Sequence, residues 1–449
     1  MKRVGIVLLT AVALLVVFTL ALAQLEARSA KHLLRVLTGE DVRGYFGSAL
    51  EGAYAFTGDK PLFAVSSTGE VQGPIRTGQV DFHDGLLAEK PVLTIRGVEE
   101  GDLFGWTLSG GGDWNGDGIP DLAVGAPNST AGGSPPGKVY VYLGGPEFGK
   151  SSAAIVTAGE KADGFGEAIS LKHDINGDGL ADLIVGAPRS HKAGATAGRA
   201  YVWYGKKEGS PAKEPDVEVK IGTTNDLFGT CIATGDLNGD GQADVAIGVP
   251  HDKLGGDWLG AVFVFHGGTG IDFKAPSQTV RGEGTAFQDQ FGRSIAIVAD
   301  QNGDGAAELA VGAPQVTVDG KQFGKVYLFY GGAKIASQAN MTFAGPTEAG
   351  RFGQLVYDLG DINGDGKGDW AVHAEAETGG RGTIRLYYGG WEKEFYKFTG
   401  ESVGDRLGNA TISVGDFDAN GSADILVGAR WNDACGENAG RVYVLGIER

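Results

Sequence analysis

The chain has 449 residues, a formal net charge of −18, 78 glycines and two cysteines. Such acidity argues against nucleic acid or an anionic membrane as a partner, because both require a basic face, and it favours cations. Two cysteines cannot build the disulfide framework that staples many secreted chains, yet a hydrophobic content of 42 % suffices for a sizeable core.

The N-terminus has the order of a targeting segment. Lys2 and Arg3 precede an apolar run from Val4, and Ala21 and Ala23 have the spacing of a cleavage site. This order predicts a secretory signal peptide over residues 1–23. Since the apolar run of about 20 residues is also long enough to span a bilayer, an uncleaved anchor is the alternative. In both cases we expect a secreted or cell-surface protein. If the signal peptide is cleaved, we expect no membrane span in the remaining chain.

A Phe-Gly pair recurs about every 60 residues, which indicates an internal repeat. The aromatic positions are Phe46, Phe104, Phe165, Phe228, Phe291 and Phe352, with Leu407 in an altered seventh copy. Each copy holds four short strand-like segments separated by turn residues, without helical periodicity. Four strands in seven copies predict an all-β, seven-bladed β-propeller over residues 24–449. A linear β-solenoid, the runner-up, would need shorter rungs.

The repeat also predicts how the ring closes. The last copy stops after its third strand, and a strand-like segment stands alone at residues 32–39, before the first Phe-Gly pair. We expect this N-terminal strand to complete the C-terminal blade and so remove an open edge. The Phe of each pair is interpreted as a wedge between neighbouring blades, and its Gly as room for a close approach.

An acidic loop follows the Phe-Gly pair in six copies, with the pattern Asp-x-Asn-x-Asp-Gly-x-x-Asp. Side chains at positions one, three, five and nine and the carbonyl of position seven are oxygen ligands suited to Ca²⁺, and the closing acid begins a strand instead of a helix. The predicted side-chain ligands are Asp113, Asn115, Asp117, Asp121; Asp174, Asn176, Asp178, Asp182; Asp236, Asn238, Asp240, Asp244; Asp300, Asn302, Asp304, Glu308; Asp361, Asn363, Asp365, Asp369; and Asp416, Asp418, Asn420, Asp424. The predicted carbonyl ligands are those of Ile119, Leu180, Gln242, Ala306, Lys367 and Ser422.

Up to six calcium ions are therefore expected, as structural staples. Magnesium fits less well, because it keeps more of its water and rarely sits in an all-protein loop. The metal-free alternative is a series of Asn-Gly and Asp-Gly turns, which favour the same residue types. Turns alone do not require an acid at both the first and the ninth position.

Phe-Gly, acidic loop and Val-Gly-Ala-Pro, as at residues 124–127, together resemble the FG-GAP repeat of the integrin α-subunit N-terminal propeller, over about residues 33–449. The resemblance implies a seven-bladed propeller, calcium on its lower face and an extracellular role in adhesion or protein binding. Three departures stand out. The first copy keeps only Asp59 of the ligand set; His373, Ala374 and Glu375 replace Gly-Ala-Pro in the sixth; and the seventh interchanges acid and amide at Asp418 and Asn420.

Loops on the opposite, upper face differ between copies, and variable loops on a repeated frame are where binding usually occurs. The expected ligand is an extracellular protein or a glycan, and the alternative for each residue is a solvated or locally packed loop position. The partner-binding candidates are Trp258, Trp431, Arg430, His191 and His251.

Two other functional classes stay open. A propeller enzyme, such as a carbohydrate-active hydrolase or lyase, would place acids or histidines at the ring's centre. The chain has neither a Gly-x-Ser-x-Gly elbow nor a His-Glu-x-x-His motif. We therefore assign no catalytic residue and predict a binding module rather than an enzyme. A structural part of an envelope assembly is the third class, and it predicts a self-partner.

Overall fold

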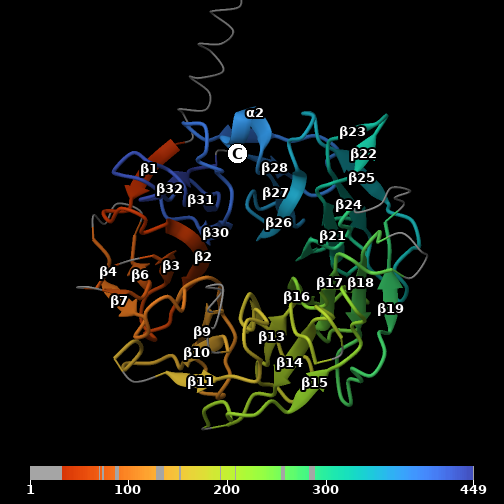
Figure 1. Cartoon of the computed structure of the whole chain (residues 1–449), viewed down its shortest axis with the longest axis horizontal. Coiled ribbons are helices and arrows are strands. Elements are labelled where there is room, and N and C mark those ends of the chain that lie inside the picture. The colour runs from red at the N-terminus through yellow and green to blue at the C-terminus, as the bar shows by residue number, and fades with distance from the viewer. Residues whose placement is uncertain are drawn as a thin grey trace, which may run out of the picture.

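The computed structural model of the chain describes residues 33–69, 71–72, 75–85, 90–127, 136–150, 153–192, 194–207, 209–253, 258–282 and 289–447. These residues form seven four-stranded antiparallel sheets arranged as blades around one axis (Figure 1). The predicted all-β propeller is confirmed. The predicted signal peptide lies outside the described residues. No helix in the described part of the chain combines the length and the apolarity needed to cross a bilayer.

The first four blades follow one another in chain order. Blade 1 is β2 (Phe46–Tyr54), β3 (Leu62–Ser67), β6 (Gln79–His83) and β7 (Leu93–Arg96); blade 2 is β8 (Leu108–Gly110), β9 (Leu122–Ala126), β10 (Lys138–Tyr142) and β11 (Ala154–Val156). Blade 3 is β12 (Ala168–Ser170), β13 (Leu183–Ala187), β14 (Arg199–Trp203) and β15 (Val217–Val219); blade 4 is β16 (Ile232–Gly235), β17 (Asp244–Val249), β18 (Ala261–Phe265) and β19 (Gln278–Val280).

The remaining blades complete the circle. Blade 5 is β20 (Ser294–Val298), β21 (Glu308–Ala313), β24 (Lys325–Phe329) and β25 (Met341–Ala344); blade 6 is β26 (Phe352–Gly360), β27 (Asp369–Ala374), β28 (Thr383–Tyr387) and β29 (Tyr396–Thr399). Blade 7 is β30 (Thr411–Gly415), β31 (Asp424–Ala429), β32 (Arg441–Leu445) and β1 (Leu33–Thr38). Minor elements are the hairpins β4 (Val71–Gln72) with β5 (Ile75–Arg76) and β22 (Thr317–Val318) with β23 (Lys321–Gln322), and the single turn α2 (Glu377–Gly380).

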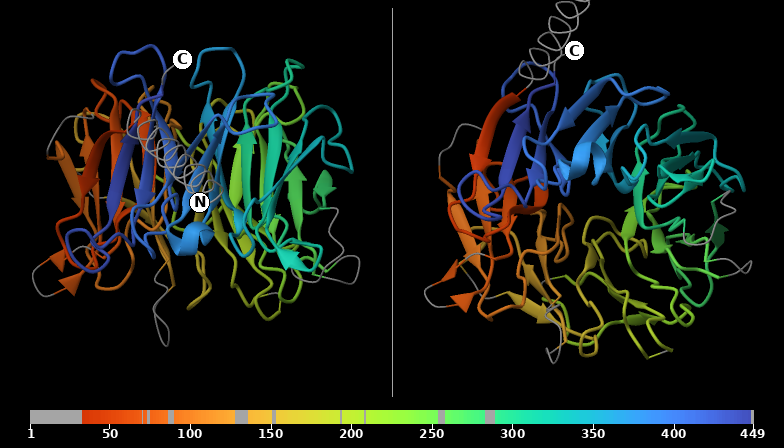
Figure 2. Two further views of the ribbon diagram at one scale, coloured as in Figure 1. Left: turned by 90° about the horizontal axis from the view of Figure 1, so that it is seen from above. Right: turned by 45° about the horizontal axis from the view of Figure 1, so that its top comes forward.

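The first strands of successive blades contact one another around the axis, from β2 and β8 through β26 and β30 back to β2. Because neighbouring strands alternate in direction, the first-to-second and third-to-fourth connections share one face of the ring, which we call the lower face. The second-to-third connections and those between blades share the other, the upper face. The side view shows the strands running between these two faces (Figure 2).

The N-terminal strand closes the ring as predicted. β1 pairs antiparallel with β32, with Val36 opposite Tyr443 and Thr38 opposite Arg441. Gly39 N–H extends the ladder by donating to Gly440 O at 3.0 Å. Blade 7 therefore draws its outermost strand from the opposite end of the sequence.

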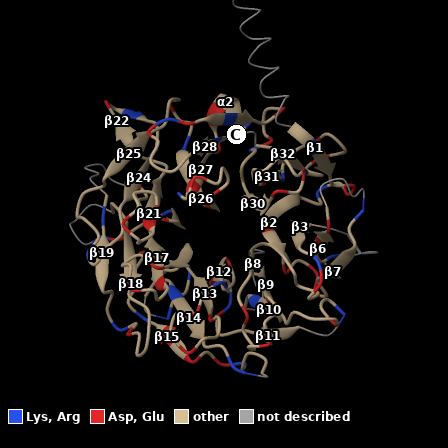
Figure 3. Cartoon of the chain, turned by 180° about the vertical axis from the view of Figure 1, so that it is seen from behind, with Lys and Arg blue, Asp and Glu red and all other residues tan. Residues whose placement is uncertain are grey.

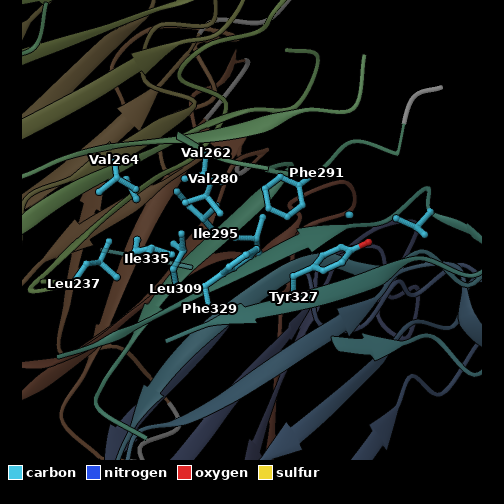
Figure 4. Packing of buried hydrophobic residues seen from close by; sticks show 14 residues of the cluster. Leu237, Val262, Val264, Val280, Phe291, Ile295, Leu309, Tyr327, Phe329 and Ile335 are labelled. Atoms are coloured by element: carbon cyan, nitrogen blue, oxygen red, sulfur yellow. The ribbon is translucent and has the colours of Figure 1, made fainter. Parts of the chain in front are cut away.

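The Phe of each repeat is the predicted wedge. Phe291, 1 % exposed, packs with Val262 and Val280 of blade 4 and with Leu309 and Phe329 of blade 5 (Figure 4). The corresponding side chains of the other repeats are also buried: Phe46, Phe104, Phe165, Phe228, Phe352 and Leu407. Seven such wedges spread the core along the blade interfaces, so that no blade buries its faces alone.

The glycines of the repeat let the backbones of two blades touch. Gly292 follows the wedge of blade 5 with φ +84°, and a Cβ there would lie 2.3 Å from Ala261 O of blade 4. Gly248, in the second strand of blade 4, would place a Cβ 2.3 Å from Gly292 O. Any larger residue at either position must separate the blades, which is the physical reason for both glycines of the motif.

Candidate functional site

Each acidic loop joins the first and second strands of a blade and so lies on the lower face. In the blade 3 loop, Asp174 at position one accepts hydrogen bonds from Gly177 N (2.7 Å) and Gly179 N (2.6 Å). The first aspartate makes the same two contacts in the loops that begin at Asp113, Asp236, Asp300 and Asp361. The first side chain therefore organises the turn around itself.

Position seven is held close to position five in every loop. In blade 3, Leu180 N donates to Asp178 Oδ1 at 2.9 Å. The same contact occurs at Ile119, Gln242, Ala306, Lys367 and Ser422. The predicted carbonyl ligands thus belong to residues that fold back onto predicted side-chain ligands.

The ninth residue has a structural role that the sequence does not reveal. Asp182 Oδ2 accepts from Ile175 N (2.9 Å) and Oδ1 from Gly205 N (2.8 Å), which joins the acidic loop to the third-to-fourth strand turn. Asp121, Asp244 and Asp369 bridge the same two segments in their blades. Burial raises the pKa of Asp182 to about 7, since it disfavours the charged carboxylate.

Two of the closing acids keep an oxygen without a partner. Glu308 Oε1 and Asp424 Oδ1 are buried and accept no hydrogen bond among the described residues, and burial raises the pKa of Glu308 to about 8 and that of Asp424 to about 6. An orphaned carboxylate oxygen beside further acids fits a cation, because a buried acceptor otherwise loses its hydration without compensation.

The best-assembled group of acids is in blade 7. Asp416, Asp418 and Asp424 place carboxylate oxygens within 4.8 Å of one another, and theirs is the sole group of this kind within the described ranges. This is the loop whose third and fifth positions are interchanged, so its second acid stands at position three. The departure from the common pattern brings its acids together, and these residues fit an oxygen-liganded divalent ion.

The upper-face candidates fall into two separate groups. His191 is exposed in blade 3, and Trp258 of blade 4 lies 5.6 Å from the ring of His251, with Lys253 Nζ 4.3 Å above its indole. Trp431 and Arg430 belong to blade 7, on another part of the ring. Both tryptophans are half-buried rather than exposed, because neighbouring side chains pack against them.

Apart from Trp431, the sequence analysis did not predict the residues that surround Arg430. Its guanidinium lies 5.2 Å from the ring centre of Trp106 and 5.4 Å from that of Trp431. Glu375, one of the residues that replace Gly-Ala-Pro in blade 6, forms ion pairs with Arg351 and Arg406, both at 2.9 Å. The broken motif at residues 373–375 was the available signal.

Comparison with known proteins agrees with the repeat pattern. The FG-GAP repeat model matches residues 104–142, 291–329 and 408–445, and an FG-GAP-like repeat model matches residues 174–247. Among curated relatives, Drosophila melanogaster integrin alpha-PS2 is 29 % identical over 275 residues, which are 56 % of this chain and 18 % of that protein. Mouse (Mus musculus) integrin alpha-7 is 37 % identical over 162 residues, 35 % of this chain and 13 % of that protein.

Another of the relatives is named as an enzyme. The phosphatidylinositol-glycan-specific phospholipase D of Bos taurus is 28 % identical over 392 residues, 76 % of this chain and 45 % of the enzyme. The chain thus spans less than half the length of each of these relatives. Among solved structures, that of BBS1N in complex with ARL6DN, soaked with mercury, superposes with a TM-score of 0.53 at 11 % identity, covering 93 % of this chain and 97 % of that one, which shows a shared fold.

Proposed function

We propose that this chain is an exported calcium-binding module that holds a protein or glycan ligand on its upper face. The proposal proceeds from its seven-bladed propeller of FG-GAP repeats, which resembles the propeller of integrin α subunits. The likeness to integrin α subunits indicates an extracellular binding module. Calcium, adhesion and removal of residues 1–23 as a signal peptide are the finer parts of the proposal.

The acid group Asp416, Asp418 and Asp424 is the observation that carries the calcium assignment. Unpartnered buried oxygens on Asp424 and Glu308 support it, because a divalent ion would satisfy them. The other loops repeat the same ligand types at the same positions. Calcium would hold each first-to-second strand turn closed, in place of the disulfides that the chain lacks.

A thermal melt of residues 24–449 tests the calcium proposal. Each site filled at 100 times its dissociation constant adds about 2.7 kcal/mol to stability, so excess calcium should raise the melting midpoint by many degrees above that in chelator. The variant Asp416→Asn with Asp418→Asn should lose part of this shift, and its midpoint in chelator measures separately what the loop hydrogen bonds of these two carboxylates contribute without metal. Equal midpoints with and without calcium would leave the loops as metal-free turns.

Capture of a partner tests the binding proposal. The propeller, immobilised in calcium, should retain a ligand from the exterior of its parent cells and release it in chelator. Replacing Trp258 or Trp431 by Ala should weaken retention, while the melting midpoint reports whether the variant is folded. Retention that neither substitution changes would place the ligand elsewhere on the ring.

Hydrolysis is a second candidate, supported by the phospholipase D similarity. Near the axis, Lys172 of blade 3 lies among charged groups of blades 1 and 6, and the carboxylate of Glu51, together with Tyr54 and Asp358, raises the pKa of Lys172 to about 12. If the chain hydrolyses a phosphatidylinositol-glycan, Lys172→Met should abolish the activity without lowering the melting midpoint. Activity that survives this substitution would show that Lys172 and the neighbouring Glu51 and Asp358 do not carry the hydrolysis.

A further inference from the structure

One arginine of the upper face is partly buried and forms no direct ion pair with the described residues. Arg430 follows β31 of blade 7, at the position where blades 2 to 5 have Pro and blade 6 has Glu375. Its Nε is buried and makes no hydrogen bond, and no carboxylate of the described residues lies within ion-pair distance of its guanidinium. Burial accordingly lowers the pKa of Arg430 from its usual value. The Glu375 carboxylate opposes this shift but forms its ion pairs with Arg351 and Arg406, so the partly desolvated Arg430 has no ion pair of its own among the described residues, which costs stability.

The surroundings hold Arg430 in one place. Asn409 Oδ1 accepts the backbone N–H of Arg430 at 3.0 Å, while Asn409 Nδ2 donates to Gly47 O and Ser48 O of blade 1. The guanidinium then lies against Trp431 of its own blade and Trp106 of blade 2, two blades away. A side chain that reaches across blade 1 in this way lies toward the axis, at its upper end.

The neighbouring charges leave an excess of positive charge. Arg351 and Arg406 share the single carboxylate of Glu375, and Arg406 also lies 5.4 Å from the ring centre of Trp431. Three cations minus one anion leave a charge of +2 within a chain of net −18. We call Arg351, Arg406, Arg430 and Glu375 the upper-face arginine cluster; Figure 3 shows how basic and acidic residues are distributed over the whole ring.

We propose that the upper-face arginine cluster binds a carboxylate side chain of an acidic protein partner, with Arg430 as the anchoring donor between Trp106 and Trp431. The inference rests on the proposed binding function and names its ligand chemistry. A planar guanidinium matches a carboxylate with two parallel hydrogen bonds. Flanking indoles exclude water from such a pair and strengthen it, as in interface hot spots rich in Trp and Arg.

A carboxylate on a protein fits these observations better than a polyanion. The cluster is small, with one guanidinium between two indoles, and so matches a single carboxylate rather than the spaced sulfates of a long glycan chain. Recognition must therefore be local and dominated by the enclosed Arg430, with Arg351 and Arg406 as exposed outer donors. Their side chains are 50 % and 49 % exposed, so they can turn from Glu375 toward a second acid.

The test is a calorimetric titration of residues 24–449, in calcium and at low salt, with a hexaglutamate peptide. We expect measurable binding that weakens as salt rises, with no binding of hexaglutamine. Arg430→Met should reduce the affinity about tenfold or more, because a charge-assisted pair is lost. Arg430→Lys should also weaken it, since Lys lacks the planar fork. The matched control Arg381→Gln removes an exposed arginine of the same face and should leave the affinity unchanged.

Melting curves of each variant show whether a loss of binding is caused by a loss of folding. Removing a partly buried charge that has no ion pair should leave Arg430→Met at least as stable as the wild type, and hexaglutamate should raise the midpoints of the wild type and Arg381→Gln more than that of Arg430→Met. Hexaglutamate binding that Arg430→Met does not weaken, or that Arg381→Gln weakens equally, would overturn the inference. So would tighter binding of inorganic phosphate or a heparin oligosaccharide than of hexaglutamate.

Failure of this inference differs visibly from failure of the proposed function. If the propeller captures a partner in calcium but hexaglutamate neither binds nor competes, the carboxylate assignment is wrong and the binding module stands. If calcium produces no shift and no partner is captured, the proposed function itself fails.

Discussion

At the scale of single residues, the glycines of the repeat combine two constraints that substitution can separate. Gly292 and Gly270 have nearly the same backbone, with φ +84° and +83°, but only Gly292 faces a neighbouring blade. Ala at either position costs about 1–2 kcal/mol for the left-handed backbone. At Gly292 the added Cβ also meets Ala261 O at 2.3 Å.

We therefore expect Gly292→Ala to destabilise the propeller by about 2 kcal/mol more than Gly270→Ala, in the range of overpacking costs. Denaturant unfolding of the two variants measures this difference. Equal losses would mean that the blades shift apart freely and that backbone strain alone selects glycine.

Two buried histidines predict acid sensitivity. Neither ring nitrogen of His83 or His373 has a hydrogen-bond partner in the described part of the chain, and burial lowers the pKa of each to about 4. The unfolded chain binds these protons first, near pH 6.5. Stability is thus complete above pH 6.5 and decreases as pH falls toward 4, by about 3 kcal/mol for each histidine.

Replacing His83, which stacks on Phe63 at 5.1 Å, with Phe should remove one proton from this pH dependence. Unfolding free energies between pH 4 and 7 provide the comparison. An unchanged slope in His83→Phe would show that this histidine is already protonated in the folded state.

At the scale of elements, each acidic loop combines exposed predicted metal ligands with a buried closing acid that holds the loop to the neighbouring strand turn. Asp178 is exposed, whereas Asp182 is buried and holds two backbone amides, one of them in the third-to-fourth strand turn. In Asp178→Asn, Oδ1 can still accept from Leu180 N and only an exposed contact with Asn176 is lost, so the substitution should act mainly on the calcium-dependent gain in stability. Asp182→Asn should cost about 1–3 kcal/mol even in chelator, because its amide can present a donor to an amide N–H.

Melts of both variants with and without calcium separate the two roles. If the melting midpoint of Asp182→Asn equalled that of the wild type in chelator, the hydrogen bonds of Asp182 would contribute nothing to stability without metal.

The ligand types of the acidic loops could be predicted from the sequence because they depend on residues close together in the chain. The order of ligand types and the turn at each acidic loop follow from residues within nine positions of one another. The contact of Asp182 with Gly205 was not predictable, because it depends on the register of a strand 23 positions away. Likewise, the half-burial of Trp431 arises from Tyr45, 5.2 Å away on the other side of the ring closure.

At the scale of the whole molecule, the sequence predicted the architecture closely. The recurring Phe-Gly pairs predicted the number of blades. Because the last copy lacks a fourth strand, the sequence also predicted that a strand near residue 33 replaces it. Sequence could not show which residues of different blades meet at the ends of the axis. Arg430 and Trp106 are separated by 324 positions and by an intervening blade, and no local pattern relates them.

Removal of β1 should open the ring. Without residues 33–38, blade 7 exposes the edge of β32, and the apolar contacts of Leu33 and Val36 with that blade are lost. We expect residues 39–449 to melt well below residues 33–449 and to self-associate through the free edge. A synthetic peptide of residues 33–38 should restore part of the midpoint. Identical midpoints for the two chains would show that six complete blades hold the ring without closure.

The closure also determines how the ring responds to mechanical load. In the β1–β32 pair, Leu33 lies opposite Leu445, so both ends of the described chain leave the ladder at the same end. A force that pulls these ends apart would break the hydrogen bonds one after another instead of shearing them together. A propeller pulled by these ends would therefore open first at blade 7, where β1 peels from β32.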